Sequence, residues 1–290
     1  MTTRRDFIKQ SSLLSAGLFV DKSEWFKKGK TLGLQLYTVR SEVSKEKLPG
    51  TLKTIAEAGY NQLELYGYNN RSFFGYSVKE MAAMLKQNGL KSPSGHYGLN
   101  DMLYGENYNW ESWKNLVEDS KMLGHKYIVV PYLDDKHRST DYFKKLADTL
   151  NKAGEISKKA GMCAGYHNHD FEFKEENGTT GWEILLKETD PKLVALEMDI
   201  YWVRHAGHDP IDWFNRYPGR FPMWHIKDLA LTPKKRSTIV GTGTIDFKAL
   251  YEKRKLAGAE YLYVEQEEYT KPVFDCIRES YDFVTKNVLS

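Results

Sequence analysis

The chain has 290 residues, of which 41% are hydrophobic and 28% charged, a composition that allows a soluble enzyme with a full core. Its net charge is only +3 and it has no basic stretch interleaved with aromatic residues, which argues against a nucleic-acid partner. Two cysteines, Cys163 and Cys276, are too few for a disulfide framework or a paired-cysteine metal site.

The N-terminal segment resembles an export signal rather than part of a fold. A pair of arginines, Arg4 and Arg5, precedes a modest apolar run from Leu13 to Val20. This arrangement is typical of a twin-arginine leader, and we expect residues 1–29 to act as leader and linker. The protein is then periplasmic or exported, and it is cytoplasmic if the leader does not function. No apolar run elsewhere is long enough to cross a bilayer, so we expect no membrane insertion.

From Thr31 onward, short apolar runs alternate with longer amphipathic ones, which predicts alternating strands and helices. The predicted strands are Leu32–Tyr37, Gln62–Tyr66, Lys91–His96, Tyr127–Pro131, Met162–His167, Val194–Asp199, Pro222–Lys227 and Tyr261–Glu265. The predicted helices are Leu52–Ala58, Val78–Gln87, Trp110–Leu123, Tyr142–Ala160, Trp182–Glu188 and Phe247–Leu256.

A glycine closes five of these segments just before a strand, and we expect each to take a left-handed conformation: Gly59, Gly89, Gly124, Gly161 and Gly258. Eight strands in about 260 residues predict a closed (β/α)8 barrel over residues 30–290 as a single domain. An open doubly wound sheet is the alternative, but no glycine-rich phosphate loop follows the first strand. The late stretch 241–244 is interpreted as a flexible loop over the site.

Several predicted strands end in residues that can bind a metal ion. Asp199, His225 and Glu265 lie at the ends of the sixth, seventh and eighth strands, and His167 ends the fifth. In a barrel the active site lies at the C-terminal ends of the strands, where neighbouring side chains converge. One imidazole with two or three carboxylates suits a single manganese, cobalt, magnesium or zinc ion.

Each of these residues also has a structural interpretation. Asp199 could cap a helix, His225 could be a hydrogen-bonded core histidine, and Glu265 could belong to the acidic run 265–268. Lys227 is interpreted either as a substrate clamp or as an ion-pair partner of Glu197 or Asp228.

Four other residues near strand ends are candidates for contact with a substrate. His96 ends the third strand, while Tyr37 and Trp202 are aromatic residues of the kind that stack on sugar rings. Glu64, in the second strand, is either a structural ion-pair partner at the barrel end or a substrate contact.

The chain resembles the xylose isomerase-like barrels of the sugar phosphate isomerases and epimerases. The resemblance rests on the segments Gly33–Arg40, Ala58–Tyr60, Tyr166–His169, Met198–Asp199, His225–Asp228, Gly241–Phe247 and Val264–Gln266. It implies one divalent metal ion bound by groups from strands five to eight, with Asp199, His225 and Glu265 as ligands.

The chain departs from the pattern of many epimerases in this superfamily, which place a glutamate at the end of strand five. Here that position is His167, and the nearest carboxylate is Glu172, so either of these two residues would supply the metal ligand from strand five. Trp202 also stands where a histidine is frequent. These departures resemble the branch of inosose dehydratases and of enzymes that act on 3-keto-glycosides, where a histidine near strand five serves as the base.

The predicted function is a metal-dependent sugar or keto-sugar isomerase or epimerase that removes a proton next to a carbonyl. His169 or Glu172 is the predicted base, and Lys227 is a further catalytic candidate. The alternative interpretation of His169 is that it only hydrogen-bonds a loop carboxylate such as Asp170. One alternative is a metal-dependent lyase or dehydratase acting on a keto-sugar or 3-keto-glycoside; another is a carbohydrate-binding barrel without catalysis. The partner is a small sugar, and the composition is compatible with a homo-oligomer.

Overall fold

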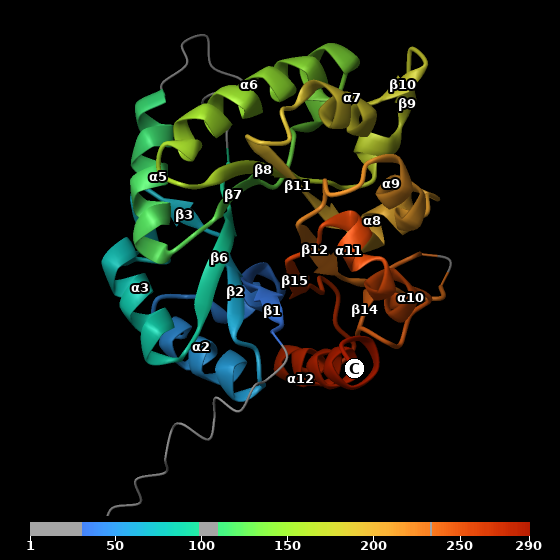
Figure 1. Ribbon diagram of the computed structural model, residues 1–290. Helices are drawn as coiled ribbons and strands as arrows, with labels where there is room; N and C mark the ends of the chain where they lie inside the picture. Colours follow the sequence, from blue (N-terminus) through green and yellow to red (C-terminus); the bar gives the residue numbers. More distant parts are fainter. Residues whose placement is uncertain (1–30, 99–109, 233) are drawn as a thin grey trace, which may run out of the picture. The chain divides into compact units, whose positions relative to one another are not determined.

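Eight parallel strands close into a ring in the computed structural model, which describes residues 31–98, 110–232 and 234–290 (Figure 1). The order around the ring is β1-β15-β12-β11-β8-β7-β6-β2. The first and last barrel strands are therefore neighbours, with Gly33 opposite Tyr263 and Leu34 opposite Val264. The strands are β1 (Gly33–Gln35), β2 (Gln62–Leu65), β6 (Lys91–His96), β7 (Tyr127–Val130), β8 (Cys163–His167), β11 (Val194–Asp199), β12 (Met223–Ile226) and β15 (Tyr261–Val264).

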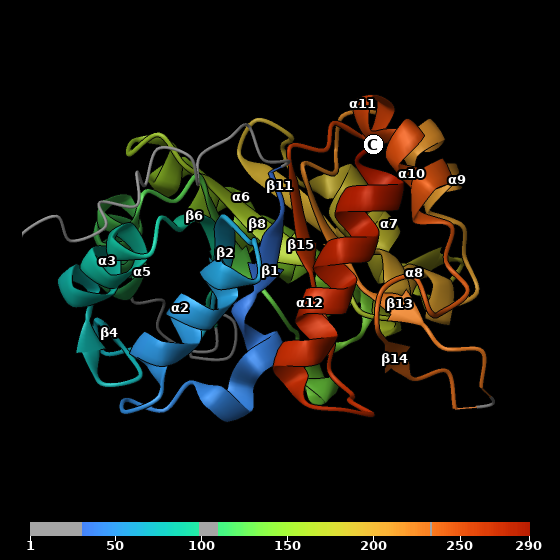
Figure 2. The same cartoon turned by 90° about the horizontal axis from the view of Figure 1, so that it is seen from below.

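The predicted (β/α)8 barrel is confirmed, and each of the eight predicted strands overlaps one barrel strand. Helices surround the strands on the outside, as the two views in Figures 1 and 2 show. They are α2 (Leu48–Glu57), α3 (Val78–Gln87), α5 (Trp110–Leu123), α6 (Thr140–Lys158), α7 (Gly181–Glu188), α8 (Ile200–His205), α9 (Pro210–Arg216), α10 (Phe247–Glu252), α11 (Arg254–Ala257) and α12 (Val273–Phe283). Of these, α8, α9 and α12 were not predicted from the sequence.

Shorter elements lie in the loops between the main ones. They are the 3-10 helices η2 (Leu36–Glu42), η3 (Asp135–His137) and η4 (Phe171–Phe173), the π-helical turn η5 (Val284–Val288), and the short strands β3 (Tyr68–Asn69), β4 (Ser72–Phe73), β5 (Tyr76–Ser77), β9 (Glu175–Glu176), β10 (Thr179–Thr180), β13 (Asp228–Leu229) and β14 (Ser237–Thr238).

The core has two layers, because side chains along a strand alternate between the barrel interior and the surrounding helices. The outer layer contains most of the buried aliphatic and aromatic side chains. A smaller interior cluster is formed by Val129, Ala195, Met223, Tyr261 and Tyr263. The interior positions that follow on the same strands toward their C-terminal ends are polar, and they include Glu197, Asp199, His225 and Glu265. The barrel therefore has an apolar base below a polar end.

The five glycines predicted to close helices all have positive φ values, between 70° and 105°. Residues 241–244, predicted to be a flexible loop over the site, are bound by Asp228. Its buried carboxylate accepts hydrogen bonds from the backbone N–H groups of Gly241 (2.9 Å), Gly243 (2.9 Å) and Ile245 (3.2 Å). Three backbone donors on one carboxylate connect this stretch to the end of β12.

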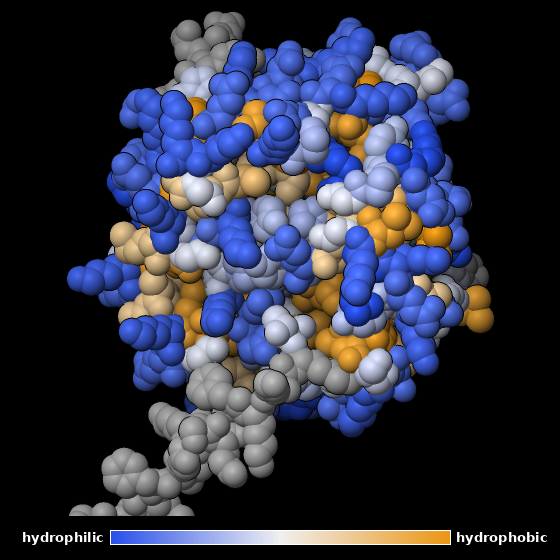
Figure 3. Space-filling view, in the orientation of Figure 1, coloured by the Kyte–Doolittle hydropathy of each residue, from blue (hydrophilic) through white to orange (hydrophobic). Residues whose placement is uncertain are grey.

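Residues Thr31–Ser290 form one compact unit. The leader predicted over residues 1–29 lies outside the described residues. Among the residues that are described, no helix combines the length and the apolar character needed to cross a membrane. On the face seen in Figure 3, hydrophilic residues predominate and hydrophobic ones are scattered between them.

His125, which lies away from the polar end of the barrel, makes the stability of the fold depend on pH. Its Nδ1 lies 2.6 Å from the Ser92 carbonyl and its Nε2 lies 2.7 Å from the Tyr97 hydroxyl, an arrangement that suits the neutral ring. Burial lowers the pKa of His125 to about 4. Because the unfolded histidine titrates near pH 6.5, its contribution to stability is complete above that pH and decreases as the pH falls toward 4.

We expect the free energy of unfolding to fall by up to about 3 kcal/mol between pH 7 and pH 4 through His125 alone. Urea unfolding of the parent and of His125→Gln over this range measures the contribution, since the variant lacks the titrating group. An equal pH slope in both proteins would contradict the assignment.

Candidate metal and active site

Four side chains predicted to bind a metal ion come together at the C-terminal ends of β8, β11, β12 and β15, which are neighbours in the ring. His167, Asp199, His225 and Glu265, here called the Asp199 group, each offer one atom within 4.8 Å of the other three. The Nε2 atom of His167 lies 3.4 Å from Asp199 Oδ2, and Nδ1 of His225 lies 2.9 Å from Glu265 Oε2. All four residues are buried.

The Asp199 group fits a cation because it leaves polar atoms without partners. Within the described part of the chain, both ring nitrogens of His167 and Oδ2 of Asp199 are buried without a hydrogen bond. Buried polar atoms of this kind are costly unless something binds them. Ligand atoms about 2.1 Å from a tetrahedral ion lie about 3.4 Å apart, close to the 3.4 Å from Asp199 Oδ2 to His167 and the 3.8 Å to His225.

The two carboxylate oxygens of Asp199 have different surroundings, and the helix cap that its sequence position allowed is confirmed. Its Oδ1 accepts a hydrogen bond of 3.1 Å from the Trp202 backbone N–H and so caps helix α8. Its Oδ2 instead faces His167 and His225, two other members of the Asp199 group. The helix cap therefore fixes the orientation of the carboxylate that points toward the candidate metal position.

A second set of four residues lies beside the first and shares His225 with it. This set, the Glu64 group, consists of Glu64, His96, Glu197 and His225. Its members contact one another directly: His225 Nε2 lies 2.7 Å from Glu64 Oε2, and His96 Nε2 lies 2.8 Å from Glu197 Oε2. These separations are hydrogen-bond lengths, as is the 2.9 Å between His225 and Glu265 in the Asp199 group. The Asp199 group also contains the wider separations of 3.4 Å and 3.8 Å, so we interpret the Glu64 group as a hydrogen-bonded support below it.

Glu64 is the central acceptor of this support. Its Oε1 accepts from the Ser94 hydroxyl at 2.6 Å and its Oε2 from the Gln35 amide at 2.8 Å. Because Glu64 accepts a hydrogen bond from Nε2 of His225, Nδ1 of His225 is left to face the other members of the Asp199 group. This arrangement is common for histidines that bind metals. Burial tends to lower the pKa of His225, but Glu197 and Glu265 raise it well above its ordinary value.

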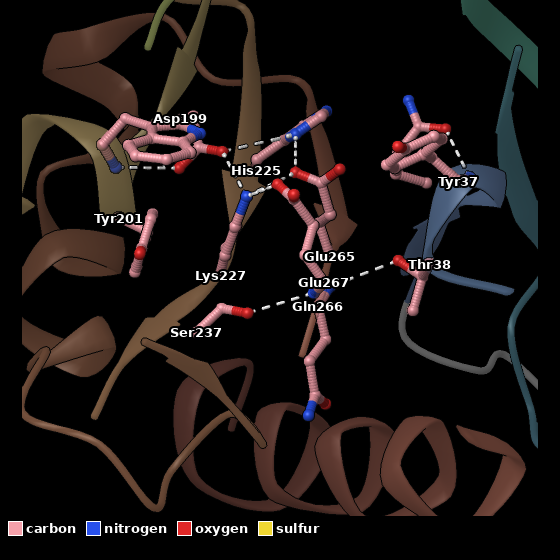
Figure 4. A network of polar contacts seen from close by, with 12 residues as sticks. Tyr37, Thr38, Asp199, Tyr201, His225, Lys227, Ser237, Glu265, Gln266 and Glu267 are labelled. Atoms are coloured by element: carbon pink, nitrogen blue, oxygen red, sulfur yellow. Dashed lines mark hydrogen bonds and ion pairs between the residues drawn. The ribbon is translucent and has the colours of Figure 1, made fainter. Parts of the chain in front are cut away.

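Lys227 adds a buried cation next to the Asp199 group (Figure 4). Its Nζ lies 3.5 Å from Glu265 Oε2 and 3.8 Å from Asp199 Oδ2, and it also pairs with Glu267. The predicted ion-pair partners Glu197 and Asp228 are wrong, because Asp228 binds the loop after β12 and Glu197 binds His96. The rings of Tyr201 and Trp202 each lie 4.9 Å from Nζ, so the ammonium group has carboxylates and aromatic faces around it.

His169, the predicted base, lies in an aromatic pocket next to His167. Its ring stacks on Phe171 at 5.6 Å between centroids, lies 5.2 Å from Trp202 and meets Tyr132 edge-on at 5.3 Å. Its Nδ1 is buried without a hydrogen bond among the described residues. Burial, together with nearby His167 and Lys227, holds the pKa of His169 well below its ordinary value, so the ring is neutral and able to accept a proton.

The alternative interpretation of His169, a hydrogen bond to Asp170, has no support in the contacts of Asp170. That carboxylate instead pairs with His205, at 3.0 Å between Oδ2 and Nδ1.

Glu172, the other candidate base, lies outside both groups. Its Oε1 is 2.7 Å from the Tyr166 hydroxyl and its Oε2 accepts from the His169 backbone N–H at 2.8 Å. Burial raises the pKa of Glu172 to about 8, which suits it poorly to bind a cation at neutral pH. Of the two candidates for the ligand from strand five, the geometry therefore favours His167.

The predicted substrate contacts fall into two kinds. Tyr37, 39% exposed, and Trp202, partly exposed, can meet a ligand, and Tyr37 lies in η2, the element after β1. His96 and Glu64 instead belong to the support below the Asp199 group. Glu197 was missed as a site residue, although strand alternation places it on the same face as Asp199. Tyr132 was also missed, because only the folded chain brings it next to His169.

Comparison with known proteins agrees with this architecture. Residues 52–286 match a protein-family model described as a xylose isomerase-like TIM barrel. A sugar phosphate isomerase/epimerase from Parabacteroides distasonis ATCC 8503 has a similar structure, with a TM-score of 0.77 and 31% identity over 89% of this chain and 94% of that one.

Two further proteins extend the comparison. An inosose dehydratase of Lacticaseibacillus casei is 31% identical over 153 residues, covering 47% of this chain and 51% of that protein. The chain thus spans about half the length of the curated relatives it matches. The IolI protein, solved with a binding zinc atom, shares the fold with a TM-score of 0.67 and 19% identity over 88% of this chain and 98% of that one.

Proposed function

The chain belongs to the xylose isomerase-like TIM barrel family, and we propose that it is a divalent-metal-dependent enzyme that removes a proton next to a carbonyl of a sugar or keto-sugar. One observation carries the proposal: the ring nitrogens of His167 and Oδ2 of Asp199, buried without a hydrogen bond among the described residues, lie beside a neutral histidine, His169, at the same end of the barrel. The relatives named inosose dehydratase and sugar phosphate isomerase/epimerase support a sugar-like substrate.

His167, Asp199, His225 and Glu265 would hold the metal ion. A bound divalent cation supplies a Lewis acid that stabilises negative charge on substrate oxygens, an effect of several kcal/mol. Manganese, cobalt, magnesium and zinc all suit this mixed set of imidazole and carboxylate ligands. The zinc in the IolI structure is consistent with such a site.

Side chains of the protein would carry out the other steps of the reaction. His169 accepts the proton from the carbon next to the carbonyl, because its ring is neutral and lies 5.0 Å from His167 between centroids. Lys227 keeps Asp199 and Glu265 in place through its ammonium group and is the candidate to contact a substrate oxygen. Trp202 and the surrounding aromatic rings limit the access of water to His169.

The fate of the proton decides the reaction class. Return of the proton to another carbon or another face gives an isomerase or epimerase, which is the main proposal. Loss of a group from the next carbon gives a lyase or dehydratase, and the inosose dehydratase relative supports this second candidate. Both reactions share the same first step.

The test is incubation of the purified protein with a panel of keto-sugars in deuterated water containing manganese. We expect deuterium to appear at a carbon-bound position of at least one sugar, measured by NMR. If a sugar stabilises the protein but no deuterium appears at carbon, the enzyme hypothesis is wrong and the carbohydrate-binding alternative takes its place.

We also propose that residues 1–29 direct export and contribute nothing to the stability of the barrel, whose strands all lie between residues 33 and 264. A chain that starts at Lys30 should match the thermal midpoint of the full chain within about 1 °C. A decrease of several degrees would show that the segment packs on the barrel. Fractionation of cells that express the full chain and the Arg4→Lys, Arg5→Lys variant tests the export.

A further inference from the structure

The buried carboxyl group of Glu172 has no part in the proposed chemistry, yet both of its oxygens have defined partners. Glu172 lies in η4, fully buried, between the Tyr166 hydroxyl and the backbone N–H of His169. Tyr166 precedes the metal-ligand candidate His167, so alternation turns its side chain away from the barrel interior. Among the described residues, the contact that links Glu172 to the site is its hydrogen bond with the backbone of His169.

The chain around His169 is fixed at two adjacent points. Asn168, also fully buried, pairs with the backbone of β11, accepting from the Asp199 N–H at 3.0 Å and donating to its carbonyl at 3.3 Å. The next residue, His169, is held by Glu172 at 2.8 Å. The first contact fixes the end of β8 to the neighbouring strand, and the second fixes the turn that follows.

The ring of His169 depends on this second contact for its position. Its Nδ1 has no hydrogen-bond partner among the described residues, and its other contacts are the rings around it. Aromatic packing tolerates sliding more easily than a hydrogen bond does. A shift of about 1 Å in a catalytic group can lower the rate about 100-fold.

We propose that Glu172 is a positioning residue, which fixes the backbone of His169 and so holds the imidazole ring against the substrate position. The proposal rests on the assignment of His169 as the base. Glutamine is the matched replacement, because its amide oxygen can accept from the His169 N–H while its NH₂ group faces the Tyr166 hydroxyl. Alanine removes both contacts.

The test compares Glu172→Ala, Glu172→Gln and Asp119→Ala. Asp119 is the control, since it is another buried carboxylate that accepts from a tyrosine hydroxyl, that of Tyr68 at 2.6 Å, but on helix α5. The first readout is hydrogen exchange of the His169 amide, which needs no substrate. The second is kcat and KM for deuterium incorporation into a keto-sugar, with metal content measured in parallel.

We expect Glu172→Ala to lower the protection of the His169 amide at least 10-fold and kcat by about 10- to 100-fold, with KM and metal content nearly unchanged. Glu172→Gln should restore both, and Asp119→Ala should change neither. Unchanged amide protection in Glu172→Ala, or an equal loss of kcat in Asp119→Ala, would overturn the proposal. If the parent exchanges no proton with any sugar, the proposed function fails, and the amide protection still decides whether Glu172 holds His169.

Discussion

Replacement of Asp199 or His225 by alanine is expected to remove the metal from the protein. Each change deletes one of four converging ligands and leaves the others without the geometry to hold an ion, so affinity should fall by more than about 100-fold. His225→Ala also leaves Glu64 and Glu265 without a partner at 2.7 Å and 2.9 Å, which should lower stability as well. The measurement is elemental analysis of purified protein, followed by titration of manganese or zinc against a chelator.

The control for this experiment is Glu267→Gln. Glu267 is a carboxylate paired with Lys227, but it is not a member of the Asp199 group. We expect the Glu267→Gln variant to keep the metal content of the parent. A loss of metal in Asp199→Ala then reflects a missing ligand rather than a changed charge. Parental metal content in both alanine variants would show that the Asp199 group is not the site.

His169→Asn is the second change for which we expect a large effect. Removal of a base from a proton-abstraction site lowers kcat by about 10²- to 10⁴-fold. Metal content should stay at the parental level, because His169 is outside the Asp199 group. Deuterium incorporation into a keto-sugar and elemental analysis together measure the two quantities.

His205→Asn is the matched control, since His205 is another partly buried histidine beside Trp202 that pairs with Asp170. It should retain most of the activity. Full exchange in His169→Asn would move the base to Lys227, whereas loss of metal would make His169 a ligand.

The barrel and the Asp199 group could be predicted from the sequence because both follow from local alternation. A strand such as Val194–Asp199 is mostly apolar and ends in a carboxylate, and the order of parallel strands in a barrel places such ends together. The convergence of Asp199, His225 and Glu265 then needs no knowledge of loops. The sequence offered a helix cap as the alternative role of Asp199, and the structure shows that cap on one oxygen while the other faces the candidate metal position.

Contacts that depend on loop conformation could not be predicted. The pairing of His205 with Asp170 and of Glu172 with the His169 backbone joins residues whose spacing in sequence carries no periodic signal. Helices α8 and α9 have only six and seven residues, too few for a helical period to stand out. The anchoring of residues 241–245 by Asp228 is a similar case, since a pair of glycines alone is compatible with a mobile loop or a fixed one.

The pairing of β1 with β15 has a consequence for how the protein is made. Gly33 and Tyr263 lie at opposite ends of the barrel sequence but on neighbouring strands, so ring closure has to await synthesis of the last strand. Glu265, one of the four metal-ligand candidates, follows directly after that strand. A nascent chain that has not yet emerged as far as Glu265 therefore has neither a closed barrel nor all four candidate ligands. Until then its barrel strands form an open sheet with two unpaired edges.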